Sequence, residues 1–149
     1  MHMPETRKNP SRPIVGVGAV VFKDDKILLI KRGKEPKKNQ WSLPGGAQNL
    51  GETAKEALAR EVIEETGLRV KITSFIDVVD FIEWGDDKST PLFQYTLLDY
   101  SADYVEGTLR ASSDAIDAQF FTLSDILALP LWSETKRVIK QAALERGLY

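Results

Sequence analysis

Three glutamates, Glu61, Glu64 and Glu65, are the residues of this sequence whose type and spacing most directly suggest chemistry. At 100° per residue on an α-helix they share an arc of about 100°. Like charges at these spacings repel one another, and near a helix C-terminus they also oppose the helix dipole. A solvated, glutamate-rich helix face is one interpretation. A bound divalent cation is the other, because it turns clustered negative charge into a ligand set.

The composition restricts any metal chemistry to oxygen ligands. The chain has no cysteine and a single histidine, His2. Disulfides, thiolate catalysis, Cys-based zinc sites and His-rich metal sites are therefore excluded. Oxygen-only ligands favour Mg²⁺ or Mn²⁺, and Mg²⁺ usually binds one or two carboxylates while keeping positions open for substrate phosphates. The glycine-lined turn at residues 44–46 could bring a backbone carbonyl to the same ion.

Size and charge indicate one soluble domain. The chain has 149 residues, of which 42% are hydrophobic, and this is enough to bury one core. Residues 1–12 lack periodicity and are expected to form a flexible lead-in to a domain at 13–149. The longest apolar run, residues 14–22, is too short to cross a bilayer, and no signal peptide is recognisable, so we expect a cytoplasmic protein. Twenty basic residues against 22 acidic ones leave no electrostatic footprint for nucleic acid.

The glutamates lie on the segment with the strongest helical signal, residues 53–66. It contains no Gly or Pro, and Gly67 follows where a helix would end. Ala54, Ala57 and Leu58 share the glutamate face, so the carboxylates point where the core should be. Strands are predicted around this helix at 14–22, 26–31, 41–43, 70–84, 92–100 and 118–122, with a helical turn at 124–129 and a helix at 133–146. The strands at 14–22 and 26–31 are expected to form one hairpin, and those at 70–84 and 92–100 another. This order predicts a mixed sheet between helices, an α/β (α+β) fold.

The spacing of residues 46–68 resembles a known family motif. Gly46 is followed by five residues and Glu52, then by seven residues and Arg60-Glu61, and the segment ends in Glu64-Glu65-x-Gly67-Leu68. This matches the Nudix box, G-x5-E-x7-R-E-U-x-E-E-x-G-U with U aliphatic, at every specified position. The approach at 41–46 and the strand with Phe120-Phe121 are also similar to that family. The resemblance therefore extends over nearly the whole chain after Pro13.

The resemblance implies a Nudix α/β/α sandwich with a central mixed sheet. It also implies a Mg²⁺-dependent (or Mn²⁺-dependent) pyrophosphohydrolase that cleaves the diphosphate linkage of a nucleoside diphosphate derivative, ADP-ribose or a similar nucleotide sugar. A MutT-like (d)NTP pyrophosphohydrolase is an alternative, since Pro91 lies well downstream of the place where ADP-ribose hydrolases often carry a proline. A non-catalytic nucleotide-binding module is a third interpretation. Homodimers are frequent in the family, whereas nucleic acid or membrane partners are not expected.

The motif also implies roles for its residues. Glu61 and Glu65 take the positions of the principal metal ligands, Glu64 that of a third ligand or the base, and the Gly46 region supplies a carbonyl. Glu52 and Arg60 take the positions that brace the loop and the helix, often as an ion pair that orients the catalytic carboxylates. In many relatives the base comes from a separate loop. Here its candidates are Asp114 and Asp117, which can equally be solvated loop residues.

Substrate contacts are predicted from basic and aromatic residues. Arg32 ends a strand near the expected phosphate site, although a basic strand end facing water is the alternative. Phe81 and Trp84, together with Phe93 and Tyr95, could stack on a base or line the pocket, but aromatic residues on strands also form cores. Trp41 is assigned to packing.

Overall fold

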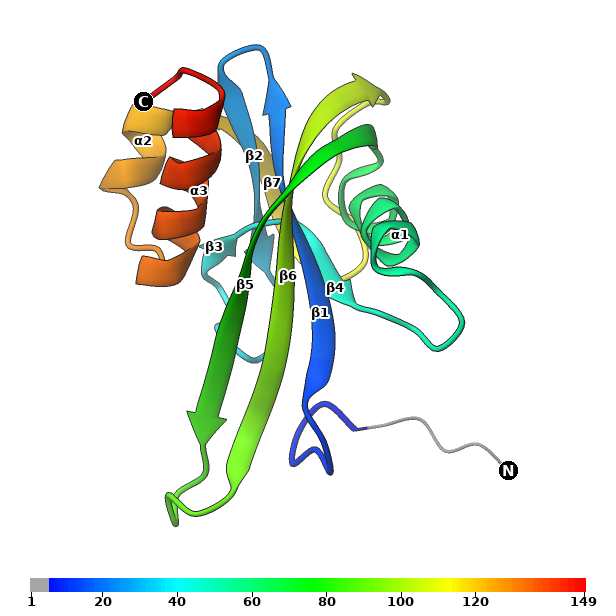
Figure 1. Ribbon diagram of the computed structural model, residues 1–149, viewed down its shortest axis with the longest axis vertical. Coiled ribbons are helices and arrows are strands. Elements are labelled where there is room, and N and C mark those ends of the chain that lie inside the picture. Colours follow the sequence, from blue (N-terminus) through cyan, green and yellow to red (C-terminus); the bar gives the residue numbers. More distant parts are fainter. Residues whose placement is uncertain (1–5) are drawn as a thin grey trace.

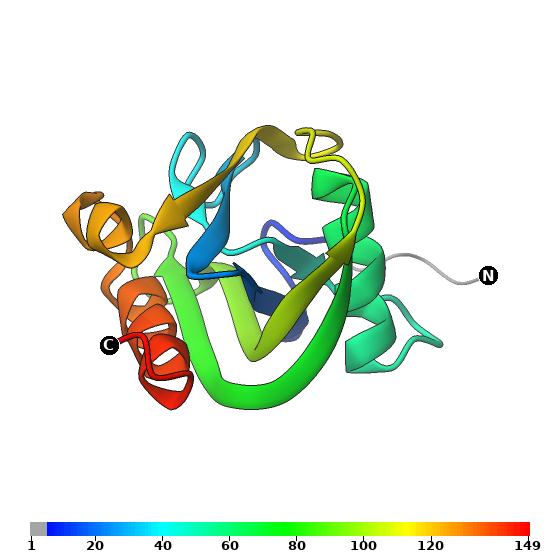
Figure 2. The same ribbon diagram turned by 90° about the horizontal axis from the view of Figure 1, so that it is seen from above.

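A computed structural model describes residues 6–149, so His2 and the rest of residues 1–5 lie outside the described part of the chain. The described residues form a seven-stranded mixed sheet. One helix covers one face of this sheet and two helices cover the other (Figures 1 and 2). This arrangement confirms the predicted α/β/α sandwich.

The centre of the sheet is β1 (Ile14–Lys23). It forms an antiparallel hairpin with β2 (Lys26–Arg32) and runs parallel to β6 (Pro91–Glu106). On the β6 side, β5 (Arg69–Trp84) pairs antiparallel with β6. On the other side, β3 (Trp41–Ser42) and β7 (Ala115–Thr122) both pair with β2. Both predicted hairpins are confirmed, although β6 continues to Glu106 rather than ending at Tyr100.

The predicted glutamate helix is α1 (Ala54–Thr66). Thr53 caps it, because its hydroxyl accepts a hydrogen bond from the backbone N–H of Glu56 while the Glu56 carboxylate accepts one from Thr53. Gly67 ends it in the left-handed conformation with φ 74°. Ala57, Leu58 and Val62 are fully buried against one face of the sheet. Capping and packing therefore fix both the length and the rotation of the helix.

Two helices cover the opposite face, α2 (Leu123–Ala128) and α3 (Ser133–Glu145). Val138, Ile139 and Ala142 of α3 pack in a second core with Val20 and Phe22 of β1. Trp41 packs on the same core, with its ring centroid 5.1 Å from that of Phe121. The assignment of Trp41 to packing is therefore confirmed.

The prediction of a plain turn at residues 44–46 is wrong. Gly45–Ala47 form a short strand, β4, which pairs antiparallel with β1 so that Gly46 lies opposite Val17. Glycine has a low strand propensity, so local sequence does not indicate this element. The pairing depends on Gly45, because a Cβ there would lie 1.9 Å from the Val17 carbonyl oxygen. The glycine-rich segment is thus held against the centre of the sheet.

The described part of the expected lead-in, residues 6–12, contains no helix or strand. The backbone N–H of Asn9 donates to the Leu92 carbonyl at 2.8 Å, which attaches this stretch to the start of β6. Within residues 6–149, none of the helices has both the length and the apolar composition needed to cross a membrane.

Candidate active site

A cavity of about 240 Å³ lies where α1, β4 and the middle of the sheet meet the start of α3. Several residues singled out by the sequence line it together: Arg32, Gly46, Glu61, Glu65, Phe81, Tyr95 and Asp114. They come from five different elements and one loop, so only the tertiary fold brings them together. The cavity is therefore the candidate active site.

Glu65, in the last turn of α1, is a buried acid at the cavity wall. It is 3% exposed, and its Oε1 accepts a hydrogen bond from the Gly45 N–H at 2.7 Å. Burial raises the pKa of Glu65 to about 8, and the nearby Glu61 charge acts in the same direction, while Gly45 and Arg32 oppose the rise. An ionised Glu65 is thus short of compensating positive charge. A cation in the cavity would supply it.

Glu61 lies one turn earlier on α1 and is 9% exposed. Its carboxylate rests on Gly46, where an added Cβ would lie 2.5 Å from Glu61 Cδ. Burial raises the pKa of Glu61 as well, opposed by a hydrogen bond from Arg60 Nη1 to Glu61 Oε1 at 2.9 Å. The absence of a side chain at Gly46 is therefore what allows this carboxylate to reach its position.

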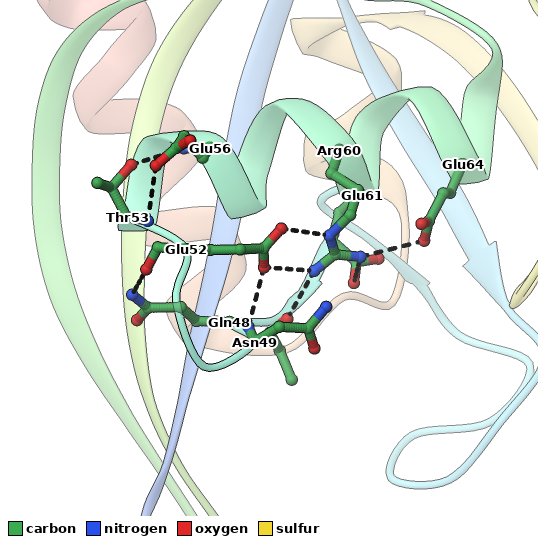
Figure 3. A network of polar contacts seen from close by, with 9 residues as sticks. Gln48, Asn49, Glu52, Thr53, Glu56, Arg60, Glu61 and Glu64 are labelled. Carbon is green, nitrogen blue, oxygen red and sulfur yellow. Dashed lines mark hydrogen bonds and ion pairs between the residues drawn. The ribbon is translucent and has the colours of Figure 1, made fainter.

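Arg60 lies at the centre of a polar network beside the cavity (Figure 3). Its Nε and Nη2 bind both oxygens of Glu52, at 2.7 and 3.0 Å. Nη2 also donates to the Ala47 carbonyl at 3.1 Å, and Nη1 donates to Glu64 at 3.2 Å as well as to Glu61. Glu52 lowers the energy of the charged guanidinium and raises the pKa of Arg60 further. The network joins α1 to β4 and the loop before α1.

We expect Arg60→Lys to weaken both the fold and the site. A lysine ammonium cannot reproduce the two-point contact with Glu52 while also binding Glu61 and the Ala47 carbonyl. The free energy of unfolding should fall by about 1–3 kcal/mol, measured by denaturant titration. Hydrolytic turnover should fall about 10- to 100-fold, because the Glu61 carboxylate would lose the guanidinium that holds it in place.

Arg69→Lys is the matched control for that variant. Arg69 pairs with Glu106 on the surface, where an ion pair contributes about 0–1 kcal/mol. Equal effects of the two substitutions on stability and turnover would show that the Arg60 network has no special structural role.

Glu64 is placed differently from its two neighbours. Its carboxylate is half-exposed, contacts Arg60 and does not line the cavity. Within residues 6–149, no three carboxylate or histidine side chains gather closely enough to hold a metal ion by themselves. On the side of α1 the cavity thus offers two buried carboxylates, Glu61 and Glu65, with all-oxygen donor chemistry. This donor set fits Mg²⁺, which commonly binds one or two carboxylates and takes its other ligands from water and phosphates.

Basic residues and one aspartate also line the cavity. Arg32 lines the cavity, and its Nε donates to the Pro36 carbonyl at 2.7 Å. Asp114 also lines it and pairs with Lys34 at 2.9 Å. Asp117 instead accepts hydrogen bonds from the backbone of Ala118 and the side chain of Gln119, and it lies outside the cavity lining.

The aromatic candidates separate into two groups. Phe81 and Tyr95 line the cavity with their rings stacked at a centroid distance of 6.4 Å. Trp84, at the far end of β5, is 52% exposed and does not line the cavity. Phe93 is buried and is not part of the lining either.

Sequence reasoning missed several residues of the lining. Arg7 comes from the expected lead-in, and its charge acts on Glu61 and Tyr95. Trp132, before α3, contacts Phe81 edge-on at 5.5 Å. Asp99, in the middle of β6, is 7% exposed and lines the cavity. Only Asp99 had a sequence signal, an acidic residue within the strand predicted at 92–100.

Comparison with known proteins agrees with this geometry. A family model described as the NUDIX domain matches residues 12–142. The chain is 37% identical over 128 residues to a protein from Methanocaldococcus jannaschii named ADP-ribose pyrophosphatase, covering 86% of this chain and 72% of that protein. It is 38% identical over 79 residues to a MutT-like protein from Streptomyces ambofaciens, covering 52% and 49% of the two chains.

A similar crystal structure is that of a MutT NUDIX hydrolase from Burkholderia pseudomallei, with a TM-score of 0.75 and 31% sequence identity. The match covers 88% of this chain and 98% of that one. The motif on α1, the sandwich around it and these matches lead to the same conclusion: the chain belongs to the Nudix hydrolase family.

Proposed function

We propose that this Nudix hydrolase cleaves the diphosphate linkage of a nucleoside diphosphate derivative, ADP-ribose or a similar nucleotide sugar. The observation that carries the proposal is the pair of buried carboxylates, Glu61 and Glu65, facing a cavity that also contains Arg32. The relative named ADP-ribose pyrophosphatase supports the substrate class.

We propose Mg²⁺, or Mn²⁺, as the cofactor, held by Glu61 and Glu65 with a backbone oxygen from the Gly46 region. When bound, the ion would neutralise diphosphate oxygens and lower the pKa of water. Arg60 and Glu52 keep the Glu61 carboxylate in place through the hydrogen bonds described above. Arg32, and Arg7 at the same cavity, would bind the remaining phosphate charge.

The reaction is hydrolysis of an acid anhydride. A water oxygen bonds to one phosphorus, the bridging P–O bond breaks, and the other phosphate leaves with the bonding electron pair. The water proton passes to a carboxylate. Glu64, Asp114 and Asp117 are the candidates for this base, and the position of Asp114 on the cavity wall favours it over the other two, which do not line the cavity.

A substrate panel tests this proposal. The protein is incubated with Mg²⁺ and ADP-ribose, NADH, dinucleoside polyphosphates or (d)NTPs, and kcat/KM values are compared. We expect ADP-ribose or a related nucleotide sugar to give the highest value. A clear preference for (d)NTPs would instead support the MutT-like alternative, which the relatives with MutT in their names favour. Binding without any turnover would support a non-catalytic module.

A further inference from the structure

Asp99 is a buried acid in the cavity that the hydrolytic reaction does not use. It lies on β6, directly opposite Gly18 of β1. Asp99 is only 7% exposed. Within residues 6–149 its carboxylate nevertheless accepts no hydrogen bond and forms no ion pair. An added Cβ at Gly18 would lie 2.5 Å from Asp99 Oδ1, so the glycine leaves the space that this carboxylate occupies.

Asp99 and the two glutamates lie on opposite sides of the cavity. Side chains alternate along β6, so Asp99 shares the sheet face of Leu97, which packs in the core beneath α3. Glu61 and Glu65 come from α1, which covers the other face (Figure 1). A nucleotide with its diphosphate at the glutamates would therefore extend another part toward Asp99.

The charged groups near Asp99 do not satisfy it. They are Arg137 of α3 and Asp77 of β5, which lies opposite Asp99 in the sheet. Arg137 is already bound to Asp77 at 2.9 Å and to Glu134 at 2.6 Å. Burial raises the pKa of Asp99 to about 6, which leaves it largely ionised and a hydrogen-bond acceptor at pH 7–8. A ligand that donates hydrogen bonds would offset the cost of burying this charge.

The surroundings of Asp99 suit a flat ring. The same cavity is lined by the apolar side chains of Leu43, Val79 and Leu97, and by the rings of Phe81 and Trp132. Apolar and aromatic walls bind the faces of a planar ring, whereas an isolated acceptor binds a donor on its edge. A nucleobase with an amino group has both a planar ring and a hydrogen-bond donor on its edge.

We propose that Asp99 accepts a hydrogen bond from the exocyclic amino group of the substrate's adenine base and thereby favours a base that carries an amino group. This inference rests on the proposed function, because it assumes that the diphosphate binds at Glu61 and Glu65. Asp99 is a specificity-determining residue in this assignment, and Gly18 makes room for it.

The test compares ADP-ribose with its analogue whose purine lacks the 6-amino group. For the unmodified protein we expect kcat/KM to be about 10- to 100-fold higher for ADP-ribose, the range of a charge-assisted hydrogen bond. Asp99→Leu keeps the number and branching of the side-chain heavy atoms but removes the acceptor, and it should bring the two values within about threefold of each other. Asp77→Asn, the same loss of charge on the neighbouring strand, should leave the preference unchanged.

The outcomes separate the two proposals. If the unmodified protein hydrolyses neither compound, ADP-ribose is overturned as the substrate in the proposed function, and the Asp99 assignment fails with it. If both are hydrolysed but Asp99→Leu keeps the preference, only the Asp99 assignment fails. If Asp99→Leu lowers kcat/KM equally for both compounds, the Asp99 assignment also fails, because Asp99 would then contact a part that both share, such as the ribose. If Asp99→Leu does not fold, Asp99→Asn replaces it, and we expect its preference for ADP-ribose to fall at least threefold.

Discussion

Replacing Glu65 with glutamine is expected to lower Mg²⁺-dependent turnover by at least about 10²–10³-fold, the effect of losing one strong electrostatic contact in an active site. Glutamine has the shape of glutamate, and its Oε1 can still accept the hydrogen bond from the Gly45 N–H. The charge that would hold the cation is lost. Steady-state kinetics at saturating Mg²⁺ measure the effect.

The Glu65→Gln variant should also be as stable as the unmodified protein, or more stable, in the absence of metal. Burial disfavours the charged carboxylate, so removing the charge removes that cost. Added Mg²⁺ should raise the Tm of the unmodified protein and have less effect on the variant. Glu145→Gln, an exposed change at the end of α3, is the control that should leave both properties unchanged. Full turnover by Glu65→Gln would rule out the assigned role of Glu65.

The sequence predicts the parts of this molecule that depend on local rules. Residues 53–66 show a capping threonine, uninterrupted helix formers and a terminal glycine, and α1 begins and ends within one residue of that range. Alternating and β-branched runs place both hairpins correctly. The spacing of the glutamates also places Glu61 and Glu65 on one face, where the cavity lies.

Other features depend on contacts between distant segments and could not be predicted. The strand at Gly45–Ala47 exists because β1 lies beside it, and Asp99 reaches the cavity because Gly18 lies opposite. Glu64 shares the helical arc of its neighbours but turns toward Arg60, because that guanidinium is already held by Glu52. That this protein forms a homodimer, as is frequent in the family, stays a prediction.

Gly46→Ala is expected to lower turnover by about 10²-fold while leaving the fold nearly intact. The new Cβ would lie 2.5 Å from Glu61 Cδ, so the carboxylate must move away. A displacement of about 1 Å in an active site can cost 10²-fold in rate. The colliding atoms are the end of a flexible side chain rather than backbone, so we expect the free energy of unfolding to change by less than about 1 kcal/mol. Alanine keeps the backbone carbonyl, so the variant tests the position of Glu61 separately from any carbonyl ligand.

The cause of that loss can be identified by combining Gly46→Ala with Glu61→Gln. If the alanine acts by displacing Glu61, it should lower the remaining turnover of Glu61→Gln by no more than about twofold, because residues that act as a unit are strongly non-additive. Gly85→Ala is the control, since the atoms nearest to an added Cβ there belong to Thr90 and Asp87 in the turn between β5 and β6, the nearest being the Thr90 carbonyl oxygen at 3.2 Å. A full 10²-fold loss on the Glu61→Gln background would mean that Gly46 acts on catalysis independently of Glu61. Glu61 would then not be the reason why a glycine is needed at this position.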